Sequence, residues 1–161
     1  MKQNKKEWFS GQIREYQDVM YGYAFCMLRN DSDAKDVMQD AIIKAFQKLE
    51  QLKNPDRFKP WIMSILRNCI YDLMRDRKEY EVLDHEWVMP DNNSISIEEK
   101  VDLYQAVQKL DFSYRTVIYL YYYDDRSVKE IARITGVNPA TVRQRLSRAR
   151  KILKELLKER N

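Results

Sequence analysis

Five cations lie within nine residues of one segment, the stretch NPATVRQRLSRARK at residues 138–151. If this segment is a helix, like charges at i,i+4 spacing repel each other by roughly 0.2–0.5 kcal/mol per pair. A ligand with regularly spaced negative charge would offset that repulsion, and nucleic acid is such a ligand. The cations are Arg143, Arg145, Arg148, Arg150 and Lys151.

The same segment has the pattern of an amphipathic helix. An apolar stripe recurs at spacings of four and three residues, and Gln144 and Arg148 point away from it. Glutamine can form two hydrogen bonds to adenine and arginine two to guanine, whereas flanking arginines suit phosphates. A solvated basic helix is the alternative. The predicted DNA-contacting residues are Ala140, Thr141, Arg143, Gln144, Arg145, Ser147, Arg148, Arg150 and Lys151.

The residues before this segment predict a helix-turn-helix. Ser127 and Glu130 have the spacing of a capping box and begin a helix that Gly136 ends. Asn138 and Pro139 then supply an N-cap and a first helical residue for the basic helix. In a helix-turn-helix the second helix enters the DNA major groove. The helix-turn-helix pattern and the polar, basic face of its second helix together favour DNA binding.

The composition predicts an all-α fold without metal or cofactor. Glycine and proline are rare, at three and four of 161 residues, and helix-forming residues recur at helical spacing. Cys26 and Cys69 fall inside helical patterns as small core residues, and His85 is the one histidine. No signal peptide or membrane span is apparent, so we expect a cytoplasmic protein without membrane insertion.

The chain is predicted to form two helical domains joined by an acidic linker. Residues 1–78 hold three helical patterns, separated by the polar cluster RNDSD and by the loop EQLKNPDRFK. Residues 79–95 lack periodicity, and Glu79–Glu99 contains seven acidic residues and no Lys or Arg. Residues 96–161 start with a Ser96–Glu99 capping box, followed by a helix from Ser113 into the tyrosine run at 121–123.

Two polar helix faces in the first domain are candidate binding surfaces. Opposite the apolar stripe of the second helix (Ala34, Val37, Met38, Ala41, Ile42, Ala45, Phe46 and Leu49) lie Asp36, Gln39, Asp40 and Ile43. A lone isoleucine among polar residues suits a partner helix. On the third helix Ser64, Asn68, Tyr71 and Arg75 share one face, and such groups hydrogen-bond to and stack on unpaired bases. Trp61 lies beside them, and a core or hinge role for it is at least as well supported.

Three stretches resemble one known family, the extracytoplasmic-function (ECF) sigma factors of bacterial RNA polymerase. They are AKDVMQDAIIKAF at 34–46, WIMSILRNCIYDLMRDRK at 61–78 and VKEIARITGVNPATVRQRLSRARKIL at 128–153. Their order and spacing agree with the family over about residues 10–157. Two departures are Asp111, where the family often has proline, and Arg67, where small residues are common.

The resemblance implies a role for each surface. Asp36, Gln39, Asp40 and Ile43 would bind core RNA polymerase. The third-helix face, completed by Trp61 and by Asn54, Arg57 and Phe58 of the preceding loop, would capture an extruded base of the downstream, minus-ten promoter element. The basic helix would read the upstream, minus-thirty-five element. The family also implies an anti-sigma factor that keeps the protein inactive until a stress signal.

Two other classes of protein compete with this interpretation. A helix-turn-helix regulator would bind operators as a dimer, whereas a sigma factor is expected to be a monomer when free. An enzyme is disfavoured because the carboxylates are scattered over helix surfaces, without a catalytic His, Cys or Ser constellation or a glycine-rich phosphate loop.

Overall fold

The computed structural model describes residues 2–77 and 97–158, except for the side chains of residues 2 and 97–101. These residues form helices and turns, with no strand among them, which confirms the all-α prediction. Contacts divide the chain into two compact units. The predicted acidic linker and the Ser96–Glu99 capping box lie outside the described side chains, and the domain boundaries at 78 and 96 stay predictions.

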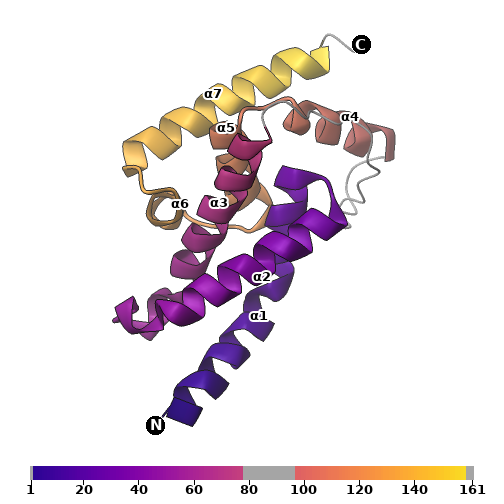
Figure 1. Ribbon diagram of the computed structural model, residues 1–161. Helices are drawn as coiled ribbons and strands as arrows, with labels where there is room; N and C mark the ends of the chain where they lie inside the picture. Colours follow the sequence, from indigo (N-terminus) through magenta and orange to yellow (C-terminus); the bar gives the residue numbers. More distant parts are fainter. Residues whose placement is uncertain (1, 78–96, 159–161) are drawn as a thin grey trace. The chain divides into compact units, whose positions relative to one another are not determined.

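The N-terminal unit is built on three α-helices that pack against one another (Figure 1). They are α1 (Lys2–Leu28), α2 (Asp31–Gln47) and α3 (Phe58–Asp76). The short 3-10 turns η1 (Leu49–Gln51) and η2 (Pro55–Arg57) connect α2 to α3. The apolar pattern begins near Trp8, whereas helix α1 already begins at Lys2. The α1–α2 break falls at the predicted polar cluster, where Arg29 has a φ of 57° and Asn30 caps α2.

Small residues on α2 explain how three helices fit closely together. Ala34, Ala41 and Ala45 are buried, and they allow the neighbouring helices to approach. Met20 and Tyr23 of α1 and Leu66 of α3 are also fully buried. Cys26 and Cys69 are buried free thiols, as predicted, and burial raises the pKa of Cys69.

From residue 97 onward, the described residues form four α-helices and one π-helical turn. They are α4 (Ile97–Gln108), α5 (Phe112–Ile118), the π turn η3 (Tyr119–Tyr123), α6 (Val128–Thr135) and α7 (Pro139–Lys158). Helix α7 packs on α4 and α5. Its buried residues Val142, Leu146, Ala149 and Leu153 are members of the predicted stripe. Among the described residues, no helix is both long and apolar enough to cross a bilayer.

Candidate DNA-binding and partner-binding surfaces

Helix α7 begins at the cap that the sequence predicts. The Asn138 side-chain oxygen accepts a hydrogen bond from the Thr141 backbone N–H at 2.8 Å and one from the Thr141 hydroxyl at 3.0 Å. Gly136, in the turn before it, has a φ of 74°, a conformation that glycine adopts without strain. Helix α6, the Gly136 turn and α7 therefore have the local geometry of a helix-turn-helix.

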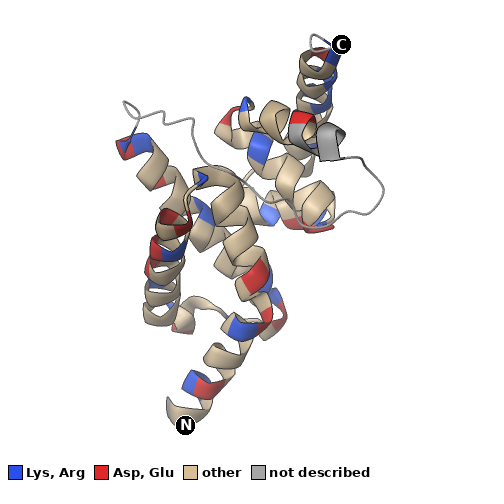
Figure 2. Cartoon of the chain, turned by 90° about the vertical axis from the view of Figure 1, so that its right-hand side faces the viewer, with Lys and Arg blue, Asp and Glu red and all other residues tan. Residues whose placement is uncertain are grey.

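The polar side of α7 is accessible along its first three turns. Arg143, Gln144 and Arg148 are exposed, while Thr141 and Arg145 are half-buried. The structure thus brings the predicted DNA-contacting residues to one side and its flanks, and Figure 2 shows Lys and Arg along this helix. The remaining exposed members of the predicted set are Ala140, Ser147, Arg150 and Lys151. Their contacts with DNA stay a prediction.

Arg150 has aromatic partners that the sequence did not predict. Its guanidinium carbon lies 5.5 Å from the ring centroids of both Tyr121 and Tyr122. Its Nε donates a hydrogen bond of 2.5 Å to the Tyr122 hydroxyl oxygen. The tyrosine run at 121–123 was expected to continue a helix, whereas Tyr119–Tyr123 forms a π turn. The run of three consecutive tyrosines was the one feature of the sequence that could have indicated an aromatic partner for Arg150.

The exposed side of α3 carries most of the predicted base-capturing residues. Asn68, Tyr71 and Arg75 are exposed, and Ser64 and Trp61 are half-buried. The Arg75 guanidinium lies 5.9 Å from the Tyr71 ring centroid. Arg75 also forms an ion pair of 3.6 Å with Asp72, the pairing expected between helix-surface charges.

Asn68 is oriented by its neighbour. An arginine can only donate hydrogen bonds, and an Arg67 terminal nitrogen lies 3.0 Å from the Asn68 side-chain oxygen. The amide NH2 of Asn68 is therefore the group turned away from Arg67. In the loop before α3, Asn54 and Arg57 are exposed as expected, and Asn54 accepts a hydrogen bond from the Asp56 backbone at 3.0 Å.

The prediction that Phe58 contacts DNA is wrong for this structure. Phe58 is 1% exposed, and its ring centroid lies 5.5 Å from Trp8 and 5.9 Å from Phe9. Tyr16 and Trp61 contact it from other sides, at 6.0 and 5.8 Å. Phe58 is a core residue because it begins α3 on the side that faces α1. Half-buried Trp61 lies between this aromatic cluster and solvent.

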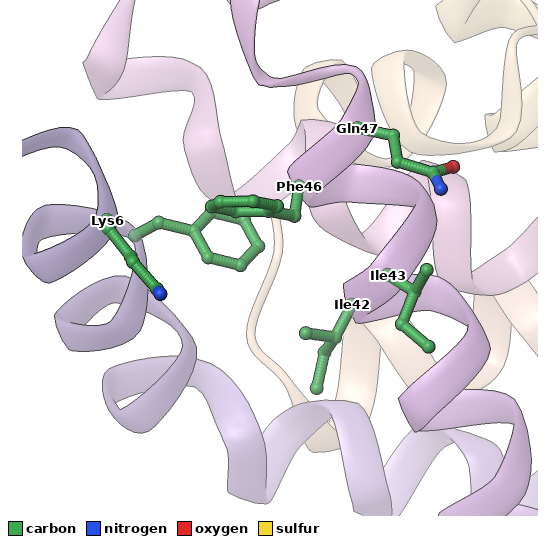
Figure 3. Close-up of a pocket in the computed structure, with 6 residues that line it drawn as sticks. Lys6, Ile42, Ile43, Phe46 and Gln47 are labelled. Carbon is green, nitrogen blue, oxygen red and sulfur yellow. The ribbon is translucent and has the colours of Figure 1, made fainter. Parts of the chain in front are cut away.

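The residues predicted to form an exposed row on α2 are exposed in the structure. Asp36, Gln39 and Asp40 are exposed, and Ile43 is 56% exposed. Phe46 was expected in the core stripe, but it is 47% exposed, which corrects that assignment. Beside Ile43, an open apolar hollow of about 350 Å³ is lined by side chains of α1 and of the end of α2 (Figure 3). It is lined by Lys6, Phe9, Ile42, Ile43, Phe46 and Gln47.

The described side chains contain no group of three His, Cys, Asp or Glu residues that could hold a metal ion. One carboxyl group in the helix-turn-helix has a shifted pKa. Burial opposes ionisation of Glu130, but hydrogen bonds from Arg126 and Ser127 outweigh burial and lower its pKa. A terminal nitrogen of Arg126 lies 2.9 Å from a carboxylate oxygen of Glu130, and this ion pair links the first turn of α6 to the segment before it.

The fold and these faces are those expected of a helical DNA-binding protein whose C-terminal residues form a helix-turn-helix. Comparison with known proteins agrees. Residues 12–80 match the model of Sigma-70 region 2, and residues 100–153 match the model of Sigma-70 region 4.

Similar proteins extend over nearly the whole chain. The RNA polymerase sigma factor SigV of Bacillus subtilis is 34% identical, over 91% of this chain and 90% of SigV. The ECF sigma factor SigW of the same organism is 29% identical, over 99% and 94%.

Solved structures show the same relationship. The sigma factor RpoE in complex with the anti-sigma factor NepR, from Bartonella quintana, has a TM-score of 0.75 and 27% identity, over 93% of this chain and 96% of RpoE. CnrH in complex with the cytosolic domain of CnrY has a TM-score of 0.72 and 26% identity, over 95% and 89%.

The chain belongs to the family of ECF sigma factors. Sigma factors are transcription initiation factors, so the protein is not an enzyme.

Proposed function

We propose that this sigma factor directs core RNA polymerase to promoters through the minus-ten and minus-thirty-five elements. The observation that carries the proposal is the exposed side of α7, where Gln144 and Arg148 lie between flanking arginines on a capped helix. Base-reading groups in the centre and cations at the edges suit a helix in the major groove. The upstream element is assigned to this helix, and the protein would work in the cytoplasm.

The N-terminal unit would contact both polymerase and DNA. The exposed row Asp36, Gln39, Asp40 and Ile43 on α2 is assigned to core polymerase, because it combines hydrogen-bonding groups with one accessible apolar side chain. The α3 side that carries Asn68, Tyr71 and Arg75 is assigned to the downstream element. Its amide donor and aromatic ring suit an unstacked base.

We further propose that an anti-sigma factor keeps the protein inactive until a stress signal. Two similar structures support this proposal, since RpoE was solved with the anti-sigma factor NepR and CnrH with the cytosolic domain of CnrY. The proposed inhibitor would prevent continuous competition for polymerase.

The test combines assembly with transcription. The purified chain should elute as a monomer in gel filtration and co-elute with added core polymerase. The resulting holoenzyme should transcribe a subset of chromosomal fragments, called here the selected promoters. A free dimer that binds a palindromic site tightly without polymerase would support the competing class, a helix-turn-helix regulator.

A paired substitution tests the polymerase surface. The double variant Asp36→Arg, Gln39→Ala should remain folded and lose co-elution with core polymerase. The matched control is Gln17→Ala, Asp18→Arg, which makes the same two changes at exposed positions of α1. Normal assembly by the α2 variant, or equal loss in the control, would contradict the assignment.

A further inference from the structure

Arg150 differs from the other arginines of α7 because two tyrosines of η3 hold its side chain. The Tyr121 and Tyr122 rings meet edge to face, with centroids 5.0 Å apart and planes at 75°. The guanidinium carbon lies 5.5 Å from each centroid, within the range of a cation–π contact. These residues belong to the same compact unit as α7.

The hydrogen bond to Tyr122 uses one particular donor of the guanidinium. Nε of Arg150 donates to the Tyr122 hydroxyl oxygen at 2.5 Å. A guanidinium carries five N–H donors in a rigid planar fork, so the two terminal nitrogens still have four N–H groups for another acceptor. Arg150 is exposed and Tyr122 is 49% exposed, so an anion can approach this edge.

The π turn explains why two adjacent tyrosines reach one guanidinium. A π-helix has more residues per turn than an α-helix, so neighbouring side chains diverge by a smaller angle. The turn closes with hydrogen bonds from Asp124 N–H to the Tyr119 carbonyl at 3.2 Å and from Arg126 N–H to the Leu120 carbonyl at 2.8 Å. Tyr119 and Leu120 are buried, which anchors the turn that carries Tyr122.

Arg143 provides an internal comparison on the same helix. It precedes Arg150 by seven residues, almost two full turns, and therefore lies on the same flank of α7. It is exposed, and it makes no ring contact or ion pair with the described part of the chain. Its side chain would lose rotamer freedom on binding a phosphate, whereas Arg150 has already lost part of that freedom.

We propose that Tyr122 is a positioning residue that orients Arg150 for contact with a DNA phosphate beside the upstream element. This inference rests on the proposed function, in which α7 lies in the major groove. Tyr122 acts through Arg150 and reads no base, so its contribution is the same for every DNA sequence.

The test is a double-mutant cycle measured on the holoenzyme with one selected promoter. Tyr122→Phe removes the hydroxyl but keeps the ring, and should weaken binding roughly three- to tenfold, as expected for one lost hydrogen bond. Arg150→Ala should weaken binding further and reduce the slope of log affinity against log salt by about 0.9, the loss of one phosphate contact. In the Arg150→Ala background, Tyr122→Phe should have no further effect.

Two controls separate positioning from a general structural role. Tyr121→Phe removes a hydroxyl from the neighbouring ring under Arg150 and should leave affinity and salt slope unchanged. In the Arg143→Ala background, Tyr122→Phe should keep its full effect, because Arg143 is independent of η3. Thermal unfolding by circular dichroism checks that each variant is folded.

Additive effects of Tyr122→Phe and Arg150→Ala, or an unchanged affinity of Tyr122→Phe, would overturn the proposal. Gln144→Ala and Arg148→Ala distinguish this failure from failure of the proposed function. If these two variants alter base preference while Tyr122→Phe does not change affinity, only the positioning role is wrong. If none of the variants changes promoter binding, the assignment of α7 to DNA is wrong.

Discussion

Asn68 shows how one neighbouring residue can decide which hydrogen-bonding group a side chain presents to its surroundings. Its oxygen accepts a hydrogen bond from Arg67 at 3.0 Å, so its NH2 group is the part presented to a ligand. A base extruded onto α3 would receive donors from this amide. The family often has a small residue at position 67, so the family resemblance did not predict the hydrogen bond that orients Asn68.

Asn68→Ala should slow promoter opening without affecting polymerase assembly. Loss of one or two hydrogen bonds to an extruded base should reduce the rate of opening by roughly tenfold, equivalent to about 1.4 kcal/mol. Permanganate reactivity of unpaired thymines at a selected promoter measures opening, and co-elution with core polymerase measures assembly. Gln17→Ala, at an exposed position of α1, is the control. Equal opening rates for Asn68→Ala and wild type would remove Asn68 from the proposed base site.

Arg148→Ala should relax base preference at a single position of the upstream element. A bidentate arginine–guanine contact contributes about 1–3 kcal/mol of discrimination. Holoenzyme affinity is measured on selected promoters that carry each of the four bases at every upstream position. Lys154→Ala, an exposed cation further along α7, should leave the base preference unchanged. An unchanged preference for Arg148→Ala at all positions would contradict its assignment to a base edge.

Phe58 shows the limit of reading single residues from a sequence. The family resemblance implied that Phe58, at the end of an exposed loop, would contact DNA. The ring instead packs against Trp8 and Phe9 of α1, and that contact depends on how two helices distant in sequence meet. Periodicity located the exposed Asn68 and Tyr71 correctly because they lie centrally on one side of a single helix.

At the scale of the element, features that depend on residues close in sequence were predicted correctly, whereas features that depend on tertiary packing were not. The Asn138 and Ser127 caps and the Gly136 turn depend on residues within a few positions of each other, so the sequence predicts them. The π turn at Tyr119–Tyr123 depends on how buried Tyr119 and Leu120 pack. Phe46 lies at the edge of an apolar stripe, and periodicity alone does not tell whether a neighbouring helix covers such a position.

The start of α6 should become less stable in acid because of Glu130. Arg126 and Ser127 lower the pKa of Glu130 below its usual 4.5, so the folded state favours the carboxylate. Its contribution is fully present above the ordinary glutamate pKa, and it is lost as the pH falls through the lower folded value. Glu130→Gln should therefore destabilise α6 by about 1 kcal/mol at neutral pH, a typical value for a capping interaction.

Amide hydrogen exchange of α6 in wild type and Glu130→Gln, compared at each pH, measures this difference. The gap in protection should remain constant from neutral pH to just above the ordinary glutamate value and close below it. Glu155→Gln, at an exposed position of α7, is the control for a change of net charge. A gap that persists unchanged below the folded pKa would show that charge on Glu130 does not stabilise the cap.

At the scale of the whole molecule, each unit carries one modest surface that we assign to DNA. A single helix-turn-helix with a few cations should bind DNA weakly and with strong salt dependence. Core polymerase would hold both units at fixed positions, so that two weak contacts act as one intramolecular pair. The free protein should therefore bind selected promoters poorly, whereas the holoenzyme should bind them well. The acidic segment predicted at residues 79–95 would oppose DNA binding by the free protein further.

Insertion of five base pairs between the two promoter elements should abolish transcription by the holoenzyme. The insertion lengthens the DNA by about 17 Å and rotates one element by roughly half a turn, so the two units cannot reach both elements at once. Run-off transcription from a selected promoter measures the effect. The same five base pairs placed upstream of both elements should leave transcription unchanged. Full transcription from the promoter with separated elements would show that the two units do not read DNA at a fixed spacing.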